Sequence, residues 1–300
     1  MEHKVRDPAY FLYRYGAMTL RSVPRPLARR LMTSIGVVAY FLFRKTRSVV
    51  ERNLRQVVGQ DVSGTELRSL VRRSFASYAR YWSDLVHLIN RVGETVDQLF
   101  DAKYLKGLDE QLASGAAVLA LPHLGAWELG GLWAHQQGYT VHTVAEPASS
   151  LRLTEWFTEQ RRELGLTVHP LGAETVPVLL DVLRRGGTVA LIADRDVVGD
   201  GIEVTFFGAK TTMPGGPALL ALRSGKPLIP CAVYHNSDDQ HLPIVLPAIS
   251  PHRDGHLRDD IARMTQDLAY AFEKIIARAP EQWHVFQPRW QDASESARGK

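Results

Sequence analysis

The chain contains a single cysteine, Cys231, and its longest uninterrupted apolar run is the nine residues from Ile35 to Phe43. One cysteine excludes an internal disulfide, and because Cys231 lies in an apolar segment we interpret it as a small buried side chain in a reducing compartment. Nine residues are too few for a helix that crosses a bilayer, which needs about 20. The basic and aromatic residues before this run do not fit a signal peptide. The sequence therefore predicts a protein of the cytosol or of the cytosolic face of a membrane.

Clusters of cysteine and histidine at metal-binding spacings are also missing. The eleven histidines are scattered along the 300 residues, so we predict no metal site. The composition is otherwise ordinary for a globular protein, with 45% hydrophobic and 23% charged residues, which is enough for a sizeable core. A chain of this length folds as one large domain or two smaller ones.

Negative charge is scarce at the N-terminal end. Residues 1–60 contain 12 Lys and Arg against 3 Asp and Glu, a net charge of +9, whereas the whole chain carries +4 and the remainder therefore −5. A basic end indicates an anionic partner, either nucleic acid or a membrane surface. The aromatic-rich segment 74–82 has the spacing of one buried helix face rather than of an exposed base-stacking platform, so we predict no nucleic-acid partner.

Two helices predicted in this basic end, at 8–22 and about 27–43, are separated by Pro24 and Pro26. Their aromatic and aliphatic residues are flanked by arginines, as in helices that lie in a membrane interface. The alternative is that they cover the core and that their arginines are solvated. We favour contact with an anionic membrane surface and predict residues 1–48 as a membrane-associating region.

From about residue 115, short β-rich runs alternate with amphipathic segments. Helices are predicted before this point at 49–58, 64–81 and 81–90. Strands are predicted at 117–121, 140–145, 167–170, 188–193, 202–206 and 228–234, and helices at 127–136, 151–164, 175–184, 216–223 and 257–278. The alternation predicts an α/β fold, a largely parallel or mixed central sheet flanked by helices, in a domain over residues 49–292 with a tail at 293–300.

The segment 119–131, Leu-Ala-Leu-Pro-His-Leu-Gly-Ala-Trp-Glu-Leu-Gly-Gly, places His123 directly after a predicted strand and Glu128 five residues later. Positions five apart lie roughly 140° apart on a helix and share no face, so the chain between them must turn. In a strand-to-helix turn, Glu128 would occupy the first helical turn and could fold back toward the imidazole. A histidine held by a carboxylate acts as a general base. The alternative is a satisfied core histidine, and the pattern alone does not decide between the two.

The segment 190–196, Ala-Leu-Ile-Ala-Asp-Arg-Asp, repeats this design of an apolar strand followed by charge. Asp194 could be a further carboxylate partner for His123, and Arg195 could bind an anion. The alternative is a solvated turn. In a third segment, 213–219, two glycines open a predicted helix, which permits close backbone approach but is equally well explained by turn formation.

The motifs His123-Leu-Gly-Ala-Trp-Glu128, Asp194-Arg-Asp196 and Met213-Pro-Gly-Gly-Pro-Ala218 occur in an order that resembles the bacterial lipid A biosynthesis (lauroyl) acyltransferase superfamily, with its H-x-x-x-x-D/E motif. Within it, the chain is most similar to the actinobacterial phosphatidylinositol mannoside acyltransferases. The similarity extends over nearly all of residues 50–290. Further shared stretches are Phe206–Gly208, Tyr78–Trp82, Ala117–His123, Thr143–Glu146, Arg161–Gly165 and Trp283–Trp290.

The resemblance implies an O-acyltransferase that moves a fatty acyl chain from acyl-CoA, a co-substrate rather than a cofactor, to a mannose hydroxyl of phosphatidylinositol mannoside. It implies a peripheral protein at the cytosolic face of the plasma membrane, with His123 as the general base. Glu128 is then the acid of the motif, Asp194 a second acid near the histidine, and Glu146 and Arg161 substrate-binding positions near the cleft. The mannoside enzymes carry Asp where this chain has Glu128, and Glu where it has Asp194. Which carboxylate contacts His123 is therefore left open.

Two alternatives stand beside this hypothesis. The first is an acyltransferase with another acceptor, either a lipid A-type glycolipid or a lysophospholipid. The second is a membrane-binding protein without catalysis, in which His123 is a structural residue.

Overall fold

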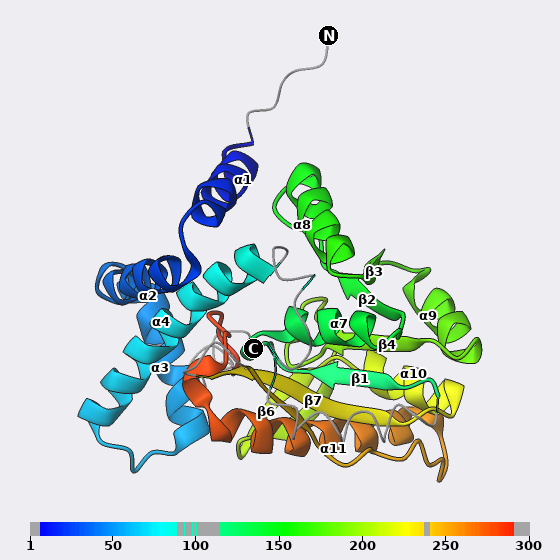
Figure 1. Ribbon diagram of the computed structural model, residues 1–300. Coiled ribbons are helices and arrows are strands. Elements are labelled where there is room, and N and C mark those ends of the chain that lie inside the picture. Colours follow the sequence, from blue (N-terminus) through cyan, green and yellow to red (C-terminus); the bar gives the residue numbers. More distant parts are fainter. Residues whose placement is uncertain are drawn as a thin grey trace.

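The computed structural model describes residues 7–88, 93, 98, 100, 115–236 and 241–290. Its N-terminal part is helical and is followed by a central sheet with helices on both faces (Figure 1). The N-terminal helices are α1 (Pro8–Arg21), α2 (Arg25–Leu42), α3 (Arg44–Val58) and α4 (Gly64–Leu88).

Local chemistry explains the ends of these helices. The Asp7 carboxylate accepts a hydrogen bond from the Tyr10 backbone N–H (3.0 Å), as N-cap residues do, and Pro8 occupies the first helical position, where no N–H is needed. Pro24 precedes α2, and α3 ends at Val58, just before Gly59, whose φ of +90° is readily adopted by glycine.

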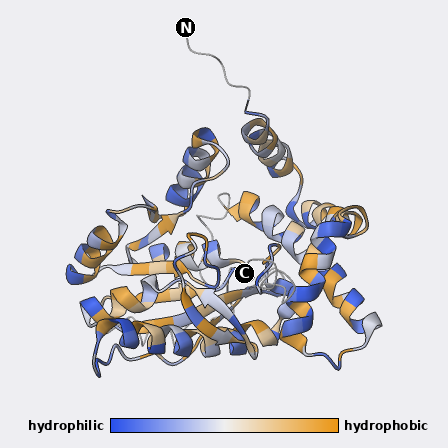
Figure 2. Cartoon of the chain, turned by 180° about the vertical axis from the view of Figure 1, so that it is seen from behind, coloured by the Kyte–Doolittle hydropathy of each residue, from blue (hydrophilic) through white to orange (hydrophobic). Residues whose placement is uncertain are grey.

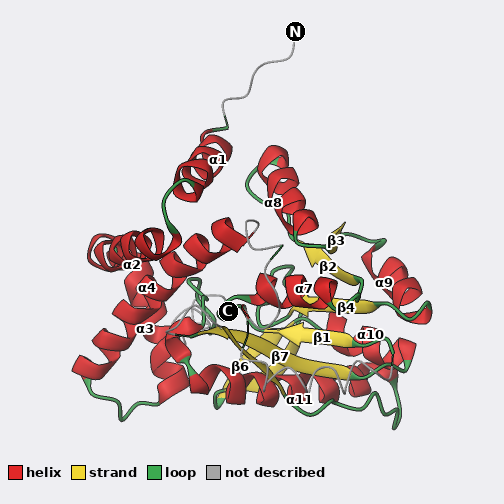
Figure 3. Cartoon of the chain, in the orientation of Figure 1, coloured by secondary structure: helices red, strands yellow, loops and turns green. Residues whose placement is uncertain are grey.

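The central sheet has the strand order β3-β2-β4-β1-β7-β8 and is parallel except for β8, which runs antiparallel to β7. Figure 3 shows β3, β2, β4, β1 and β7 of this sheet. The strands are β1 (Val118–Leu121), β2 (Val141–Ala145), β3 (Leu166–Pro170), β4 (Thr188–Ile192), β5 (Ile202–Phe206), β6 (Ala209–Met213), β7 (Leu228–His235) and β8 (His241–Val245). The helices around the sheet are α7 (Trp127–Gln136), α8 (Leu151–Glu163), α9 (Thr175–Arg184), α10 (Gly216–Ser224) and α11 (Leu257–Arg278). The predicted α/β class, with a largely parallel sheet flanked by helices, is confirmed.

Strand β1 shows how the sheet divides the core. Val118 and Ala120 pack on the side of α10 and α11, whereas Leu119 and Leu121 pack on the side of α7. This follows from the two-residue period of a strand, whose successive side chains point to opposite faces. All four residues are buried, as expected for a strand covered on both faces.

The structure differs from the prediction in the boundaries of α3 and α4, and it contains two strands, β6 and β8, that were not predicted. Helix α3 begins at Arg44 rather than near residue 49, and α4 runs unbroken where two helices meeting at Tyr81 were predicted. Strands β5 and β6 form a hairpin around Phe207 and Gly208, which both have positive φ, the geometry of a two-residue hairpin turn. The polar composition of β6 and the absence of an Asn-Gly turn concealed this strand. The predicted helical residues 89–90 and the tail at 293–300 lie outside the described residues.

Helix α2 packs closely on α4. A Cβ atom on Gly36 would lie 2.4 Å from the Phe75 carbonyl oxygen, so glycine permits this approach. Tyr40, Val50 and Leu54 then share a small core with α4. The boundary predicted at residue 48 falls within α3, and a separate membrane-associating region stays a prediction. Of the helices described, none is alone long and apolar enough to span a membrane, and α2 and α3 pass that test only as a pair bent by 99°.

Candidate active site

His123 and Asp194 come together through the register of two parallel strands. In the ladder between β1 and β4, Leu121 pairs with Ile192. His123 and Asp194 each lie two residues farther along, so both reach the same carboxyl edge of the sheet. Ligands of parallel α/β sheets usually bind at this edge.

The Asp194 carboxylate contacts His123 through both of its oxygens. Oδ1 lies 2.6 Å from His123 Nδ1, and Oδ2 accepts a hydrogen bond from the His123 backbone N–H at 3.0 Å. Oδ2 also accepts a bond from the Trp283 indole N–H at 2.7 Å. Asp194 is fully buried, so these bonds are shielded from water and the carboxylate is held in one orientation.

The charge state of Asp194 fixes the tautomer of the imidazole. Burial raises the pKa of this carboxyl, but the nearby His123 and the hydrogen bonds from His123 and Trp283 outweigh burial and lower the pKa from 3.8 to about 2. An ionised carboxylate only accepts hydrogen bonds, so Nδ1 must carry a proton. Nε2 is then the basic nitrogen in the neutral ring. The His123 side chain remains 22% exposed, which leaves the ring accessible from the cleft that it lines.

The five-residue spacing between His123 and Glu128 is a turn, as predicted. Gly125 adopts a φ of +63°, and a Cβ atom there would lie 2.0 Å from the Val233 carbonyl oxygen. The same oxygen accepts a hydrogen bond from the Ala126 N–H at 2.8 Å, which ties the turn to β7. Helix α7 begins immediately afterwards and places Glu128 in its first turn.

Of the two carboxylates that the sequence left open, Asp194 contacts His123, and Glu128 does not fold back onto the imidazole. Its Oε1 accepts a hydrogen bond from the Tyr81 hydroxyl at 2.9 Å and lies 3.5 Å from Arg161 Nη2. The first turn of α7 directs this side chain toward α4, and the Trp127 ring contacts both His123 (5.7 Å between ring centroids) and Tyr81 (4.4 Å). Burial raises the pKa of Glu128, while Arg161 and Tyr81 oppose that rise.

The predicted substrate-binding residues line the cleft that contains His123. Glu146 follows β2, Arg161 comes from α8, and Arg195 follows Asp194. Arg195 Nη2 lies 3.4 Å from Glu146 Oε2, and its Nη1 donates to Gln287 Oε1 at 2.9 Å. Cations and hydrogen-bonding groups thus line the same cleft as His123. Over the described residues, no group of three or more His, Cys, Asp and Glu side chains is arranged to hold a metal ion.

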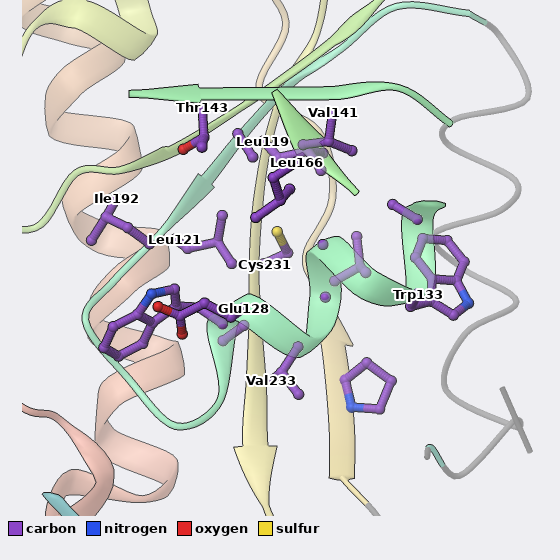
Figure 4. Close-up of a pocket in the computed structure, with 18 of the residues that line it drawn as sticks. Leu119, Leu121, Glu128, Trp133, Val141, Thr143, Leu166, Ile192, Cys231 and Val233 are labelled. Atoms are coloured by element: carbon purple, nitrogen blue, oxygen red, sulfur yellow. The ribbon is translucent and has the colours of Figure 1, made fainter. Parts of the chain in front are cut away.

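An apolar cavity adjoins this cleft between the sheet and α7 (Figure 4). The cleft and the cavity share lining from Trp127, Val144, Arg161 and Ile192, which marks where they meet. The cavity leaves about 100 Å³ in which the centre of a water-sized molecule can lie. Its walls from the sheet include Leu119, Leu121, Val141, Leu166, Cys231 and Val233. Cys231 is buried as predicted, and burial raises the pKa of its thiol to about 12.

Trp283, Tyr81 and His284 were assigned no role from the sequence, although all three take part in the site. The segment of Trp283 and His284, called the Trp283 segment below, lies along the turn after His123. Trp283 forms a β-bridge with Leu124, and the His284 N–H donates to the His123 carbonyl oxygen at 2.7 Å. Tyr81 reaches Glu128 from 47 residues away, and Trp283 reaches Asp194 from 89 residues away. The stretches 78–82 and 283–290 resemble the family, but no local pattern in the sequence places them at the histidine.

Comparison with known proteins assigns the chain to a family. The family model for bacterial lipid A biosynthesis acyltransferase matches residues 1–292. A phosphatidylinositol mannoside acyltransferase of Mycobacterium tuberculosis (strain H37Rv) is 36% identical over 98% of this chain and 93% of its own length. A protein of the same name from Mycolicibacterium smegmatis is 35% identical over 96% and 93% of the two chains, and a lipid A biosynthesis acyltransferase of Haemophilus influenzae is 23% identical over 89% and 82%. The chain therefore belongs to the bacterial lipid A biosynthesis acyltransferase family and is an acyltransferase.

Proposed function

We propose that the protein transfers a fatty acyl chain from acyl-CoA to a mannose hydroxyl of phosphatidylinositol mannoside, as an O-acyltransferase with His123 as the general base. The observation that carries this proposal is the pairing of the partly exposed His123 ring with the buried Asp194 carboxylate at the edge of an open cleft. The names of the mycobacterial relatives support the choice of acceptor.

The reaction follows from this arrangement of the imidazole. Nε2 of His123 removes the proton from the acceptor hydroxyl while the hydroxyl oxygen attacks the thioester carbonyl carbon. The new C–O bond forms, the C–S bond breaks, and the imidazolium returns its proton to the departing CoA thiolate. Asp194 holds the ring in the Nδ1-protonated tautomer and stabilises the imidazolium, a role that carboxylates have in other histidine-based sites. Acyl-CoA is consumed as a co-substrate, and the proposal includes no cofactor.

The cavity and the cleft suggest how two different substrates are accommodated. The apolar walls between the sheet and α7 suit a hydrocarbon chain, whose thioester would then lie where the cavity meets the cleft. The cleft is also lined by Glu146, Arg161 and Arg195, which suit the hydroxyls of a sugar and the phosphate of an anionic glycolipid. Glu128 acts on this site indirectly, by positioning Arg161.

Helices α1 and α2 supply a surface for a lipid bilayer. Twelve of the eighteen exposed large apolar side chains in the described part of the chain lie between Phe11 and Phe43. Leu42 is 70% exposed, and Figure 2 shows apolar residues along both helices. Exposed basic side chains accompany them: Arg14, Arg30, Arg44 and Lys45. This combination supports peripheral attachment to an anionic leaflet at the cytosolic face of the plasma membrane.

The acceptor is tested by supplying radiolabelled palmitoyl-CoA together with one purified lipid at a time. The lipids are phosphatidylinositol mannoside, a lipid A precursor and a lysophospholipid. We expect label in the mannoside, and His123→Ala should lower the rate by at least about 10²-fold, the usual contribution of a general base. Label in another lipid but not in the mannoside would refute the proposed acceptor. Transfer at an unchanged rate by His123→Ala would refute the general base.

Membrane attachment is tested on the full chain with the double variant Phe41→Ser/Leu42→Ser. Both side chains are exposed, so their removal leaves the core intact. Sedimentation with anionic vesicles should fall by about 10-fold or more because apolar area is lost from the interface. Tyr270→Ser removes an exposed aromatic side chain from α11 and is the matched control. Equal loss of vesicle binding in both variants would contradict attachment through α1 and α2.

A further inference from the structure

The side of α7 that faces the apolar cavity carries unusually small residues. Trp127, Gly130, Gly131 and Ala134 all line the cavity, and their spacing of i, i+3, i+4 and i+7 places them on one face of the helix. Glu128 and Trp133 also line the cavity from α7, at the two edges of this face, but within the face no side chain beyond Trp127 is larger than a methyl group. A helix packed on a sheet normally fills such a face with large apolar residues. Glycine within a helix is also destabilising relative to alanine, so this composition needs a reason.

The presence of glycine is explained differently at positions 130 and 131. A Cβ atom on Gly131 would lie 2.6 Å from Leu166 Cδ2, so glycine at 131 allows α7 to approach β3. A Cβ atom on Gly130 would meet only the Val233 side chain, with Cγ2 at 3.4 Å. Packing therefore does not demand glycine at position 130, and the space that a side chain would occupy there belongs to the cavity.

A buried carboxylate independently marks this cavity as a ligand site. Glu128 lines it with only 3% of its surface exposed. Among the described residues its Oε2 makes no hydrogen bond of ordinary distance and angle, although the nearby Trp127 side chain acts to lower the pKa of Glu128. The residues shared with the cleft, Trp127 and Arg161, place this group at the end of the cavity nearest His123. The cavity thus has a polar end at the reaction site and apolar walls farther along α7. An acyl thioester has the same distribution of polarity.

We propose that Gly130 and Ala134 set the longest acyl chain that the protein transfers. This inference rests on the proposed function, because it assumes that the cavity holds the acyl group of the donor. Position 130 lies about 4.5 Å along the helix axis from Trp127 and position 134 about 6 Å farther, at 1.5 Å per residue. A larger side chain at 130 blocks the cavity nearer to the thioester than the same side chain at 134.

The experiment measures kcat/KM of the full-length protein with acyl-CoA donors from C10 to C18 and phosphatidylinositol mannoside in vesicles as the acceptor. The variants are Gly130→Leu and Ala134→Leu, and Gln137→Leu adds the same side chain at the exposed end of α7 as the control. Gly130→Leu should lower kcat/KM for C16 and C18 by at least about 10-fold relative to C10, as pockets discriminate added methylenes. Ala134→Leu should affect only the longest donors, and Gln137→Leu none.

Separate outcomes identify which proposal fails. If the wild-type protein transfers no acyl group from any donor, the proposed function is refuted. If the wild-type protein is active but folded Gly130→Leu loses the same factor with every donor, or if Ala134→Leu excludes shorter chains than Gly130→Leu does, the role of these residues is refuted. Thermal melting reports folding. Should Gly130→Leu not fold, Gly130→Ala adds one methyl group and should still lower the C18-to-C14 ratio by about 2-fold. An unchanged ratio would overturn the inference.

Discussion

Two buried carboxylates of the site, Asp194 and Glu128, are in opposite electrostatic situations. Asp194 receives hydrogen bonds from His123 and Trp283, which hold its pKa near 2 despite complete burial. For Glu128 burial is the stronger influence, and its pKa is raised even though Tyr81 and Arg161 contact it. The motif from His123 to Glu128 contains a histidine and an acid that are close in sequence. The carboxylate that contacts His123 is nevertheless that of Asp194, which follows β4.

This difference shows what a short motif encodes here. The turn between His123 and Glu128 brings the histidine to the sheet edge and the acid to a helix that faces α4. The acid that orients the imidazole comes from the strand register instead. We therefore expect Asp194 to control the chemistry at His123, and Glu128 to control the packing and charge around Arg161.

The largest expected effect is that of Asp194→Asn. The amide can still occupy the site, but it neither stabilises an imidazolium nor imposes the Nδ1-protonated tautomer, so kcat should fall by about 10²–10⁴-fold. The measurement is kcat for acyl transfer from palmitoyl-CoA, with circular dichroism to confirm folding.

Asp196→Asn is the matched control, because it makes the same substitution two residues away. Asp196 accepts hydrogen bonds from Gly199, Gly201 and Thr212 and none from the histidine. Because none of these three bonds involves His123, Asp196→Asn should change kcat by less than about 10-fold. Equal losses in the two variants would show that the loop, rather than the carboxylate at His123, is responsible.

The second test is the pH dependence of stability, where the two carboxylates should act with opposite sign. As pH falls from about 4 to 2 the unfolded chain protonates Asp194 before the folded protein does, so this group's contribution of about 2 kcal/mol to the free energy of unfolding is lost. The raised pKa of Glu128 has the reverse effect, because its contribution is complete below 4.5 and is lost as pH rises through the folded-state pKa.

Denaturant unfolding from pH 2 to pH 7 measures both contributions. The stability curve of Asp194→Asn should be flatter than the wild-type curve below pH 4, and that of Glu128→Gln should be flatter above pH 4.5. Two variants that flatten the same part of the curve would contradict the opposite shifts.

The third test concerns Trp283, the residue that fixes Asp194 from the far side. Trp283→Phe removes the indole N–H donor to Oδ2, so kcat should fall about 10-fold while KM for acyl-CoA stays constant. Trp290→Phe is the matched control, since its ring packs near Trp283 but its indole N–H bonds to none of the described residues. If both variants lower kcat equally, the loss comes from ring packing rather than from the bond to Asp194.

The sequence predicted the fold class and the location of His123 because both depend on local patterns. An apolar strand that ends at Pro122 places His123 at the sheet edge, and the glycine-containing turn after it predicts the start of α7. Which of the two carboxylates, Asp194 or Glu128, contacts His123 does not follow from the local sequence. It depends on how β1 pairs with a strand about 70 residues away, and on a Trp283 segment that follows α11. Neither the pairing nor the approach of that segment leaves a periodic pattern.

The smallest expected effect on turnover is that of Glu128→Gln. Glutamine keeps an oxygen that can accept the Tyr81 hydrogen bond, and Arg161 is 28% exposed, so water can compensate for the lost charge. We expect kcat to fall by about 3- to 10-fold, as for one perturbed contact. Glu128→Ala should differ from Glu128→Gln in stability rather than in kcat. It leaves the buried Tyr81 hydroxyl without its acceptor and should lower the free energy of unfolding by about 1–3 kcal/mol. A loss of kcat with Glu128→Gln as large as that with Asp194→Asn would mean that both carboxylates act on the reaction, and the contrast between them would then be one of position alone.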